Sequence, residues 1–309
     1  MIDNAPYRKQ VSLLMRVLPT VAQEHCFALK GGTAINLFIR DMPRLSVDID
    51  LAYLPVKPRD ESLQEIDAAL KNIAAKIEKS VADTKVRPSL LQGTDRAVKL
   101  VVSTRDAQIK IEVTPVLRGT VFPQKTRAVS EKVQTEFGFA EIAVVSFEDL
   151  YGGKLVAALD RQHPRDLYDV RLLLANEGLT RDLFRAFLVY LISHDRPMSE
   201  IISPRFRDIT HEFEHGFAGM TVDAVSREEL ESTRKDLIER IHNAFSDDDR
   251  EFLLSIKRGE PKWDLLGISG VESLPAVRWK LQNLEKLQEK KRTQLIEQLT
   301  KVLMKKGNE

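Results

Sequence analysis

The chain of 309 residues has little cysteine, few aromatic residues and no long apolar run. Its one cysteine, Cys26, excludes a framework of intramolecular disulfides and is typical of a protein from a reducing cytoplasm. No apolar stretch approaches the roughly 20 residues that span a bilayer, so no membrane partner is expected. The N-terminus has no charged region followed by an apolar one, so no signal peptide is expected either. Hydrophobic residues make up 43% and charged residues 30%, which predicts a soluble globular protein and not a disordered one.

Cys26 follows His25 at the end of a predicted helix, and the pair invites a catalytic or metal-binding interpretation. Two neighbours in sequence are weak support for either role. We therefore expect Cys26 to be a buried structural thiol.

The formal net charge of +1 conceals a basic C-terminal stretch that begins at Arg278. With few acidic neighbours, this stretch holds Lys280, Lys286, Lys290, Lys291, Arg292, Lys301, Lys305 and Lys306. Such a stretch indicates contact with nucleic acid or, equally, a solvated helix face.

A glycine turn marks one candidate site. The segment Phe27 to Lys30 is predicted to be a short strand, and Gly31-Gly32-Thr33 then opens a helix that continues to Ile39. Backbone N–H groups at a helix N-terminus attract phosphate, and glycine permits a close approach. The Thr33 hydroxyl is a candidate further donor.

Two aspartates follow the glycine turn in the predicted strand Leu45 to Leu51. Residues two apart in a strand point to the same face, so Asp48 and Asp50 are expected to project together while Ile49 faces a core. Paired carboxylates of this kind are typical ligands of Mg²⁺ or Mn²⁺. A lone Asp-x-Asp is usually a solvated turn, but its place after Gly-Gly-Thr favours a metal site for phosphoryl chemistry.

Another predicted strand, Gln108 to Pro115, alternates apolar and polar residues. Glu112 shares one face with Lys110 and Thr114. If this strand lies beside the acidic strand, Glu112 is a candidate third metal ligand; the alternative is an exposed charge on an amphipathic strand.

Charged residues are also dense after Ser146, where the composition becomes helical. Lys154 and Arg161 occur on a helix rich in small residues, and we interpret both as candidates for neutralising phosphate charge. Pro164 is expected at the start of the next helix, which carries Asp166 and Asp169. Asp169 is interpreted as a base or as an orienting partner of Lys154, and Asp166 as a charge at a helix N-terminus.

The order of elements predicts an α+β fold with two domains. Residues 1–145 are expected to form a mixed sheet flanked by helices, and residues 146–309 a helical domain that completes the active-site cleft and ends in a basic helix. The main helices expected there are Leu183 to Ile192, Arg227 to Phe245, Asp247 to Ile256 and Ala276 to Leu303.

These motifs together resemble the AbiEii/AbiGii family of nucleotidyltransferase toxins, whose members include the mycobacterial MenT toxins and belong to the DNA polymerase β-like superfamily. The resemblance covers residues 25–170 and continues weakly to Leu303. It rests on Gly31-Gly32-Thr33, Ser46-x-Asp48-Ile49-Asp50, Lys154-x-x-Ala157-x-x-x-Arg161 and Arg165-Asp166-x-x-Asp169.

The resemblance implies a polymerase β-like nucleotidyltransferase domain with metal ligands Asp48 and Asp50. Lys154 and Asp169 are implied as further active-site residues. An NTP would contact the glycine turn and the residues Thr33, Ser46, Lys154 and Arg161. The superfamily often has serine after the first glycines, so Gly32-Thr33 leaves open whether a hydroxyl or only backbone N–H groups contact the triphosphate.

The implied activity is Mg²⁺-dependent transfer of a nucleotide from an NTP to RNA, with the tRNA 3′ end as acceptor. Blocked translation, growth arrest, a cognate antitoxin and a role in phage defence are the further implications.

Two alternatives remain. One is nucleotidylation or phosphorylation of a protein such as the antitoxin, and the other is a non-catalytic module that binds NTP or RNA. A metal-dependent nuclease would account for Asp-x-Asp but not for Gly-Gly-Thr.

Overall fold

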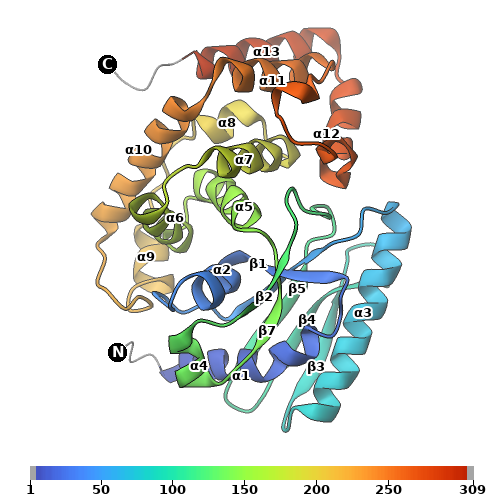
Figure 1. Ribbon diagram of the computed structural model, residues 1–309, viewed down its shortest axis with the longest axis vertical. Helices are drawn as coiled ribbons and strands as arrows, with labels where there is room; N and C mark the ends of the chain where they lie inside the picture. Colours follow the sequence, from blue (N-terminus) through green and yellow to red (C-terminus); the bar gives the residue numbers. More distant parts are fainter. Residues whose placement is uncertain (1–4, 305–309) are drawn as a thin grey trace. The chain divides into compact units, whose positions relative to one another are not determined.

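The computed structural model describes residues 5–304, which divide into two compact units (Figure 1). The first unit runs to Ser146 and takes in the short segment Gly219–Ala224. The second unit comprises Phe147–Ala218 and the chain from Val225 onward. Over the described residues, no helix combines the length and apolar character that crossing a membrane requires.

The first unit is built on one seven-stranded mixed sheet, in the order β3-β4-β5-β2-β1-β7-β6. In the middle of the sheet, β2 pairs antiparallel with β1 and parallel with β5, and β1 pairs parallel with β7. The strands are β1 Phe27–Lys30, β2 Asp48–Tyr53, β3 Lys85–Leu90, β4 Ala97–Ser103, β5 Gln108–Val113, β6 Lys125–Ala128 and β7 Glu141–Val144. This sheet, together with the helices that follow it in the chain, confirms the predicted α+β class.

The described residues of the first unit also form five helices. They are α1 Ala5–Val21, α2 Gly31–Ala34, the π-helix η1 Ile35–Ile39, α3 Arg59–Ser80 and α4 Glu131–Phe137. Of these, α1, α2 and α3 contact the sheet. The long helix α3 contacts β3 and β4 (Figure 1). It buries Leu63, Ile66, Leu70, Ile73 and Ile77, residues three or four apart that lie on one helix face.

The acidic strand differs from its predicted bounds. It begins at Asp48 rather than Leu45, and it continues to Tyr53. Arg44 and Leu45 instead contact the returning segment of the first unit: Arg44 forms a bridge with Thr221, and Leu45 N–H donates to the Met220 carbonyl at 3.0 Å. This connection is non-local, so the local alternation of apolar residues did not reveal it.

The two strands at the edges of the sheet, β3 and β6, had no counterpart in the sequence-based prediction. Their residues are almost all exposed or half-buried, so neither strand has the apolar alternation that marks a strand with one buried face.

The second unit is helical in its described part. Its α-helices are α5 Phe147–Asp160, α6 Pro164–Asn176, α7 Arg181–Ser193, α8 Met198–Ile202, α9 Thr210–Gly216, α10 Arg227–Ala244, α11 Asp247–Arg258, α12 Pro275–Glu285 and α13 Glu289–Leu303. Short 3₁₀ turns cover Trp263–Leu265 and Val271–Ser273. Pro164 occupies the first turn of α6, as predicted, and the preceding His163 side chain accepts a hydrogen bond from Arg165 N–H.

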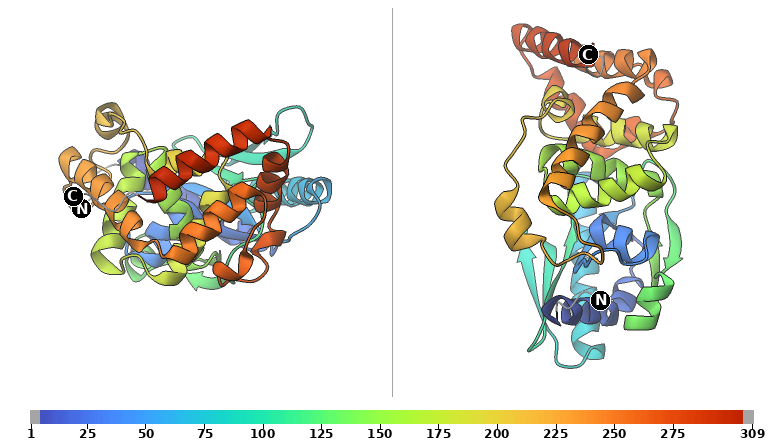
Figure 2. Two further views of the ribbon diagram at one scale, coloured as in Figure 1. Left: turned by 90° about the horizontal axis from the view of Figure 1, so that it is seen from above. Right: turned by 90° about the vertical axis from the view of Figure 1, so that its left-hand side faces the viewer.

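The single C-terminal helix predicted for Ala276 to Leu303 is wrong, because two helices replace it. The chain breaks between Glu285 and Glu289, and the Arg292 side chain donates to the Leu284 carbonyl at 3.0 Å where the first helix ends. Figure 2 shows α13 as a separate rod that packs along α11.

The lysines of the basic C-terminal stretch differ in their exposure to solvent. Lys280 is largely withdrawn from solvent, and its ammonium donates to the carbonyls of His194, Asp195 and Arg196. Burial lowers the pKa of Lys280 from its ordinary value. Lys286, Lys290, Lys291 and Lys301 are exposed, whereas Lys305 and Lys306 lie outside the described residues.

Candidate active site

The glycine turn packs directly against the acidic strand within the first unit. Gly31 has φ of +73°, in the left-handed region that side chains rarely adopt. A Cβ atom added to Gly31 would collide with an Asp50 carboxylate oxygen. The position therefore requires glycine for two independent reasons, backbone conformation and room for Asp50.

Gly32 packs just as closely, against Arg44 and Ser46. A Cβ atom on Gly32 would lie 2.8 Å from a guanidinium nitrogen of Arg44 and 3.0 Å from Ser46 Oγ. Arg44 is only 2% exposed, and it donates to the Leu45 carbonyl at 3.0 Å. The sequence-based prediction gave Arg44 no role; its place two residues before Ser46 in the motif was the available signal.

The Thr33 hydroxyl forms its hydrogen bonds with other residues of the first unit. The residue is 1% exposed, and its Oγ1 donates to the Asp48 carbonyl and lies 3.0 Å from Ser46 Oγ. One hydroxyl has one proton, so this geometry assigns Thr33 to holding the start of β2 beside the glycine turn. Backbone N–H groups are then the donors that the turn offers to a ligand.

Asp48 and Asp50 lie on one face of β2, as the alternation predicted. Both are half-buried, while Ile49 and Leu51 between and after them are completely buried on the other face. Two half-buried carboxylates on one face suit Mg²⁺, which commonly takes one or two carboxylates together with substrate phosphates. Over residues 5–304 there is no cluster of three or more His, Cys, Asp or Glu placed to hold a metal ion.

Glu112 lies beside Asp50 but contacts a lysine. Strands β5 and β2 are neighbours, and Asp50 and Glu112 are register partners, which satisfies the condition set for a third ligand. The Glu112 carboxylate is 51% exposed and pairs with Lys99 of β4 at 3.1 Å. This geometry matches the alternative interpretation, a charge on an amphipathic strand, better than a metal ligand.

A lysine to which the sequence-based prediction gave no role flanks Asp50 on its other side. Lys30 of β1 is the register partner of Asp50, and its ammonium donates to Thr114 Oγ1 at 2.8 Å. The row Lys99, Glu112, Asp50 and Lys30 thus crosses four strands with two acids between two lysines. The two outer pairs, Lys99 with Glu112 and Asp50 with Lys30, have opposite charges that stabilise a sheet, whereas the like-charged central pair Glu112 and Asp50 opposes that stabilisation.

The second unit holds the other predicted residues in a buried ionic cluster. Lys154 of α5 is 8% exposed, and its ammonium lies 2.9 Å from Asp166 Oδ1 and 3.1 Å from Asp169 Oδ2. Asp169 is fully buried on α6. The interpretation of Asp169 as an orienting partner of Lys154 fits this geometry.

Asp166 forms ion pairs with two basic residues, which its sequence position did not indicate. Besides Lys154, its carboxylate contacts Arg161 at 2.8 Å, whose side chain is 62% exposed. Burial acts to raise the pKa of Asp166, but the charges of Lys154 and Arg161 outweigh it and hold that pKa below its ordinary value. Asp166 lies in the first turn of α6, as expected of a charge at a helix N-terminus, and it is in addition one member of a buried ionic network.

Cys26 has no sign of a reactive thiol. It is half-buried and free, and burial raises its pKa to about 11, so the thiol stays protonated at neutral pH. His25 is exposed.

Comparisons with known proteins assign the chain to a family. Curated proteins offered no match to this chain. Among solved structures, MenT4, a nucleotidyltransferase toxin from Mycobacterium tuberculosis H37Rv, aligns with a TM-score of 0.58 at 16% identity, over 96% of this chain and 93% of that one. At that identity the similarity shows a shared fold. A family model described as the nucleotidyl transferase AbiEii toxin of a type IV toxin-antitoxin system matches residues 12–283. Because that match spans most of the chain, the protein belongs to the AbiEii family of nucleotidyltransferase toxins.

Proposed function

We propose that this protein transfers a nucleotide from an NTP to the 3′ end of tRNA in a reaction that depends on Mg²⁺. Modified tRNA cannot be aminoacylated, so translation and growth stop. A cognate antitoxin partner restrains the toxin, and growth arrest after infection would serve phage defence.

The observation that carries the proposal is the packing of the glycine turn onto the acidic strand. Gly31 leaves room for the Asp50 carboxylate, and Thr33 ties the turn to the backbone of Asp48. A phosphate-binding turn and a carboxylate pair are thereby held together in one unit. A module that only binds NTP or RNA has no need for that combination.

Each residue of the first unit has a defined task in this proposal. Asp48 and Asp50 would hold the divalent metal, which supplies activation of the attacking hydroxyl and stabilisation of the pyrophosphate leaving group. The backbone N–H groups after Lys30 bind phosphate, since the first N–H groups of a helix have no intrahelical acceptor. Buried Arg44 adds positive charge beside Gly32, and Ser46 positions Thr33.

The residues of the second unit are proposed to act through charge. Lys154 and Arg161 neutralise the triphosphate as negative charge moves onto the leaving group. Asp166 and Asp169 hold the Lys154 ammonium in a fixed position, and we assign Asp169 to this orienting task.

The test is incubation of the purified protein with each of the four labelled NTPs, Mg²⁺ and total tRNA. Label on the tRNA 3′ end, abolished by EDTA and by Asp48→Asn, is the expected result. The matched control is Asp95→Asn, because Asp95 is an exposed aspartate of the same unit. Absence of transfer, with Asp48→Asn as toxic as the wild type, contradicts the proposal.

An added measurement distinguishes transfer to RNA from the alternative, transfer to a protein acceptor. The antitoxin is co-expressed and its mass is measured. Nucleotide or phosphate mass on the antitoxin, with unlabelled tRNA, would replace the RNA acceptor with a protein one.

A further inference from the structure

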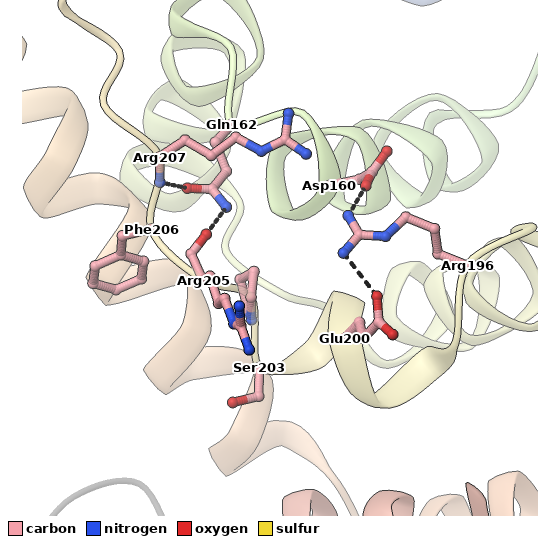
Figure 3. A pocket seen from close by; sticks show the side chains of 9 residues that line it. Asp160, Gln162, Arg196, Glu200, Ser203, Arg205, Phe206 and Arg207 are labelled. Carbon is pink, nitrogen blue, oxygen red and sulfur yellow. Dashed lines mark hydrogen bonds and ion pairs between the residues drawn. The ribbon is translucent and has the colours of Figure 1, made fainter.

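An exposed loop of the second unit carries the sequence Arg205-Phe206-Arg207 between α8 and α9. All three residues are exposed, and Phe206 is 53% exposed, which is unusual for a residue with so large an apolar side chain. The loop lines a pocket of about 540 Å³, together with Asp160, Gln162, Arg196 and Glu200 (Figure 3). None of these residues belongs to the site described above.

Buried polar side chains hold the backbone of this loop in place. Gln162, only 1% exposed, donates to the Arg205 carbonyl at 2.8 Å and accepts from Arg207 N–H at 3.0 Å. Arg234, 4% exposed, donates to Gln162 Oε1 and to the Arg207 carbonyl, both at 2.8 Å. The loop therefore presents its side chains from a fixed backbone, which lowers the entropy lost on binding.

Gln162 adopts a backbone conformation that shows how closely this support is specified. Its φ is +54°, an uncommon value for a residue other than glycine. Local strain of this kind persists only where surrounding contacts impose it, and it often occurs at functional sites.

The Phe206 ring is supported on one side by a charge. The Arg234 guanidinium lies 4.3 Å from the ring centroid, a cation–π contact. Phe206 nevertheless remains exposed to solvent. An anchored ring with an accessible surface is a stacking platform, the device by which proteins bind bases of single-stranded nucleic acids.

The charges around the platform favour a polyanion. Arg196 pairs with Asp160 and with Glu200, at 2.9 Å for the latter, so the two acids of the pocket are already compensated (Figure 3). Among the residues that line the pocket, the guanidinium groups of Arg205 and Arg207 form no ion pair (Figure 3), and both residues are exposed. Two arginines without an ion-pair partner in the pocket thus flank one exposed ring.

We propose that this loop binds a single-stranded segment of RNA. One unstacked base packs on Phe206, and neighbouring phosphates contact Arg205 and Arg207. An acidic peptide would use the two arginines but leave the ring without a stacking partner, and a duplex would not offer an unstacked base. The identification of the ligand as RNA rests on the RNA acceptor proposed above; the site itself rests on the loop.

The test measures binding of a fluorescently labelled single-stranded oligoadenylate RNA by anisotropy, without NTP, at several salt concentrations. Phe206→Ala is expected to weaken binding about tenfold, and Phe206→Tyr to retain it. The double variant Arg205→Ala/Arg207→Ala is expected to reduce the slope of log K against log salt by about 1.4, because each single-strand phosphate contact contributes about 0.7.

Matched controls come from the first unit. Phe139 is 58% exposed and Arg105 is exposed, so Phe139→Ala and Arg105→Ala remove the same groups elsewhere and should bind RNA as the wild type does. Circular dichroism and thermal midpoints verify that each variant is folded. Unchanged RNA binding by folded Phe206→Ala overturns the inference. So does a loss of antitoxin binding by that variant without a loss of RNA binding, which would make the loop a protein-binding surface.

A parallel transfer assay distinguishes this inference from the proposed function. If Phe206→Ala loses RNA binding while the wild type labels no RNA, the binding site stands and the proposed acceptor is wrong. If the wild type labels tRNA and Phe206→Ala does so with unchanged KM for tRNA, the transfer function stands and the inference is wrong.

Discussion

The carboxylates of the two units differ in how deeply they are buried. Asp48 and Asp50 of the first unit lie half-buried on a sheet face, next to a turn in which the missing side chain of Gly31 makes room for the Asp50 carboxylate. Asp166 and Asp169 of the second unit are buried and surround the ammonium of Lys154. Substitution of a half-buried carboxylate on a sheet face is expected to affect mainly activity, whereas substitution within a buried ionic cluster is expected to affect stability as well.

The largest effect is expected from Asp48→Asn. Loss of one metal-binding carboxylate should lower the rate of nucleotide transfer about a thousandfold, because the charge that develops in the transition state loses its stabilisation. The thermal midpoint should stay within the range of the Asp95→Asn control. A large fall in stability for Asp48→Asn alone would show that this pair is structural, as in the second unit.

Lys154→Met should come next and should affect stability directly. It leaves Asp169 and Asp166 buried without their ammonium partner, at a cost of about 3 kcal/mol in the free energy of unfolding. Urea denaturation measures the change. The control Lys71→Met removes an exposed pair with Asp67 and should cost less than about 1 kcal/mol. Equal values for the two variants would contradict the contrast between the units.

Gly31→Ala should separate backbone strain from crowding at Asp50. Both Gly31 and Gly93 have positive φ, but a Cβ atom on Gly93 would meet nothing within 4 Å. Each alanine variant should lose about 1–2 kcal/mol of stability from the left-handed backbone alone. Gly31→Ala should in addition reduce transfer, about tenfold or more, by displacing Asp50 from the geometry of the reaction. Equal activity of both variants would remove Asp50 from the site.

The smallest effect is expected on the pH dependence of stability. Because the pKa of Asp166 is lower in the folded protein, its ionised form stabilises the fold above its ordinary pKa near 3.9, and this contribution is lost as pH falls. Arg161→Gln removes one of the two charges that lower this pKa, across a pair with a largely exposed partner, at a cost of less than about 1 kcal/mol. Thermal midpoints of the variant and the wild type should differ at pH 7 and converge toward pH 3. A difference that grows in acid would reverse the assigned sign.

Local patterns predicted much of the first unit. The Phe27–Lys30 strand matches β1, and the alternation around Ile49 and Ile111 marked the two neighbouring strands that carry the acids. The edge strands β3 and β6 were missed because almost all of their residues lie toward solvent, which removes the periodic signal. The C-terminal helix was predicted as one piece because the break after Glu285 contains neither proline nor glycine.

The sequence by itself identified the glycine turn and the pair Asp48 and Asp50 as the candidate site, because a glycine turn that opens a helix and aspartates two apart in a strand are together typical of metal-dependent phosphate chemistry. Tertiary structure decided what each side chain contacts. It directs the Thr33 hydroxyl to the Asp48 carbonyl, pairs Glu112 with Lys99, and buries Arg44 against Gly32. It also holds the Arg205–Arg207 loop on Gln162 and Arg234, residues distant in sequence. Hydrogen bonds and ion pairs between distant segments depend on where the chain places both partners, and no local spacing encodes that placement.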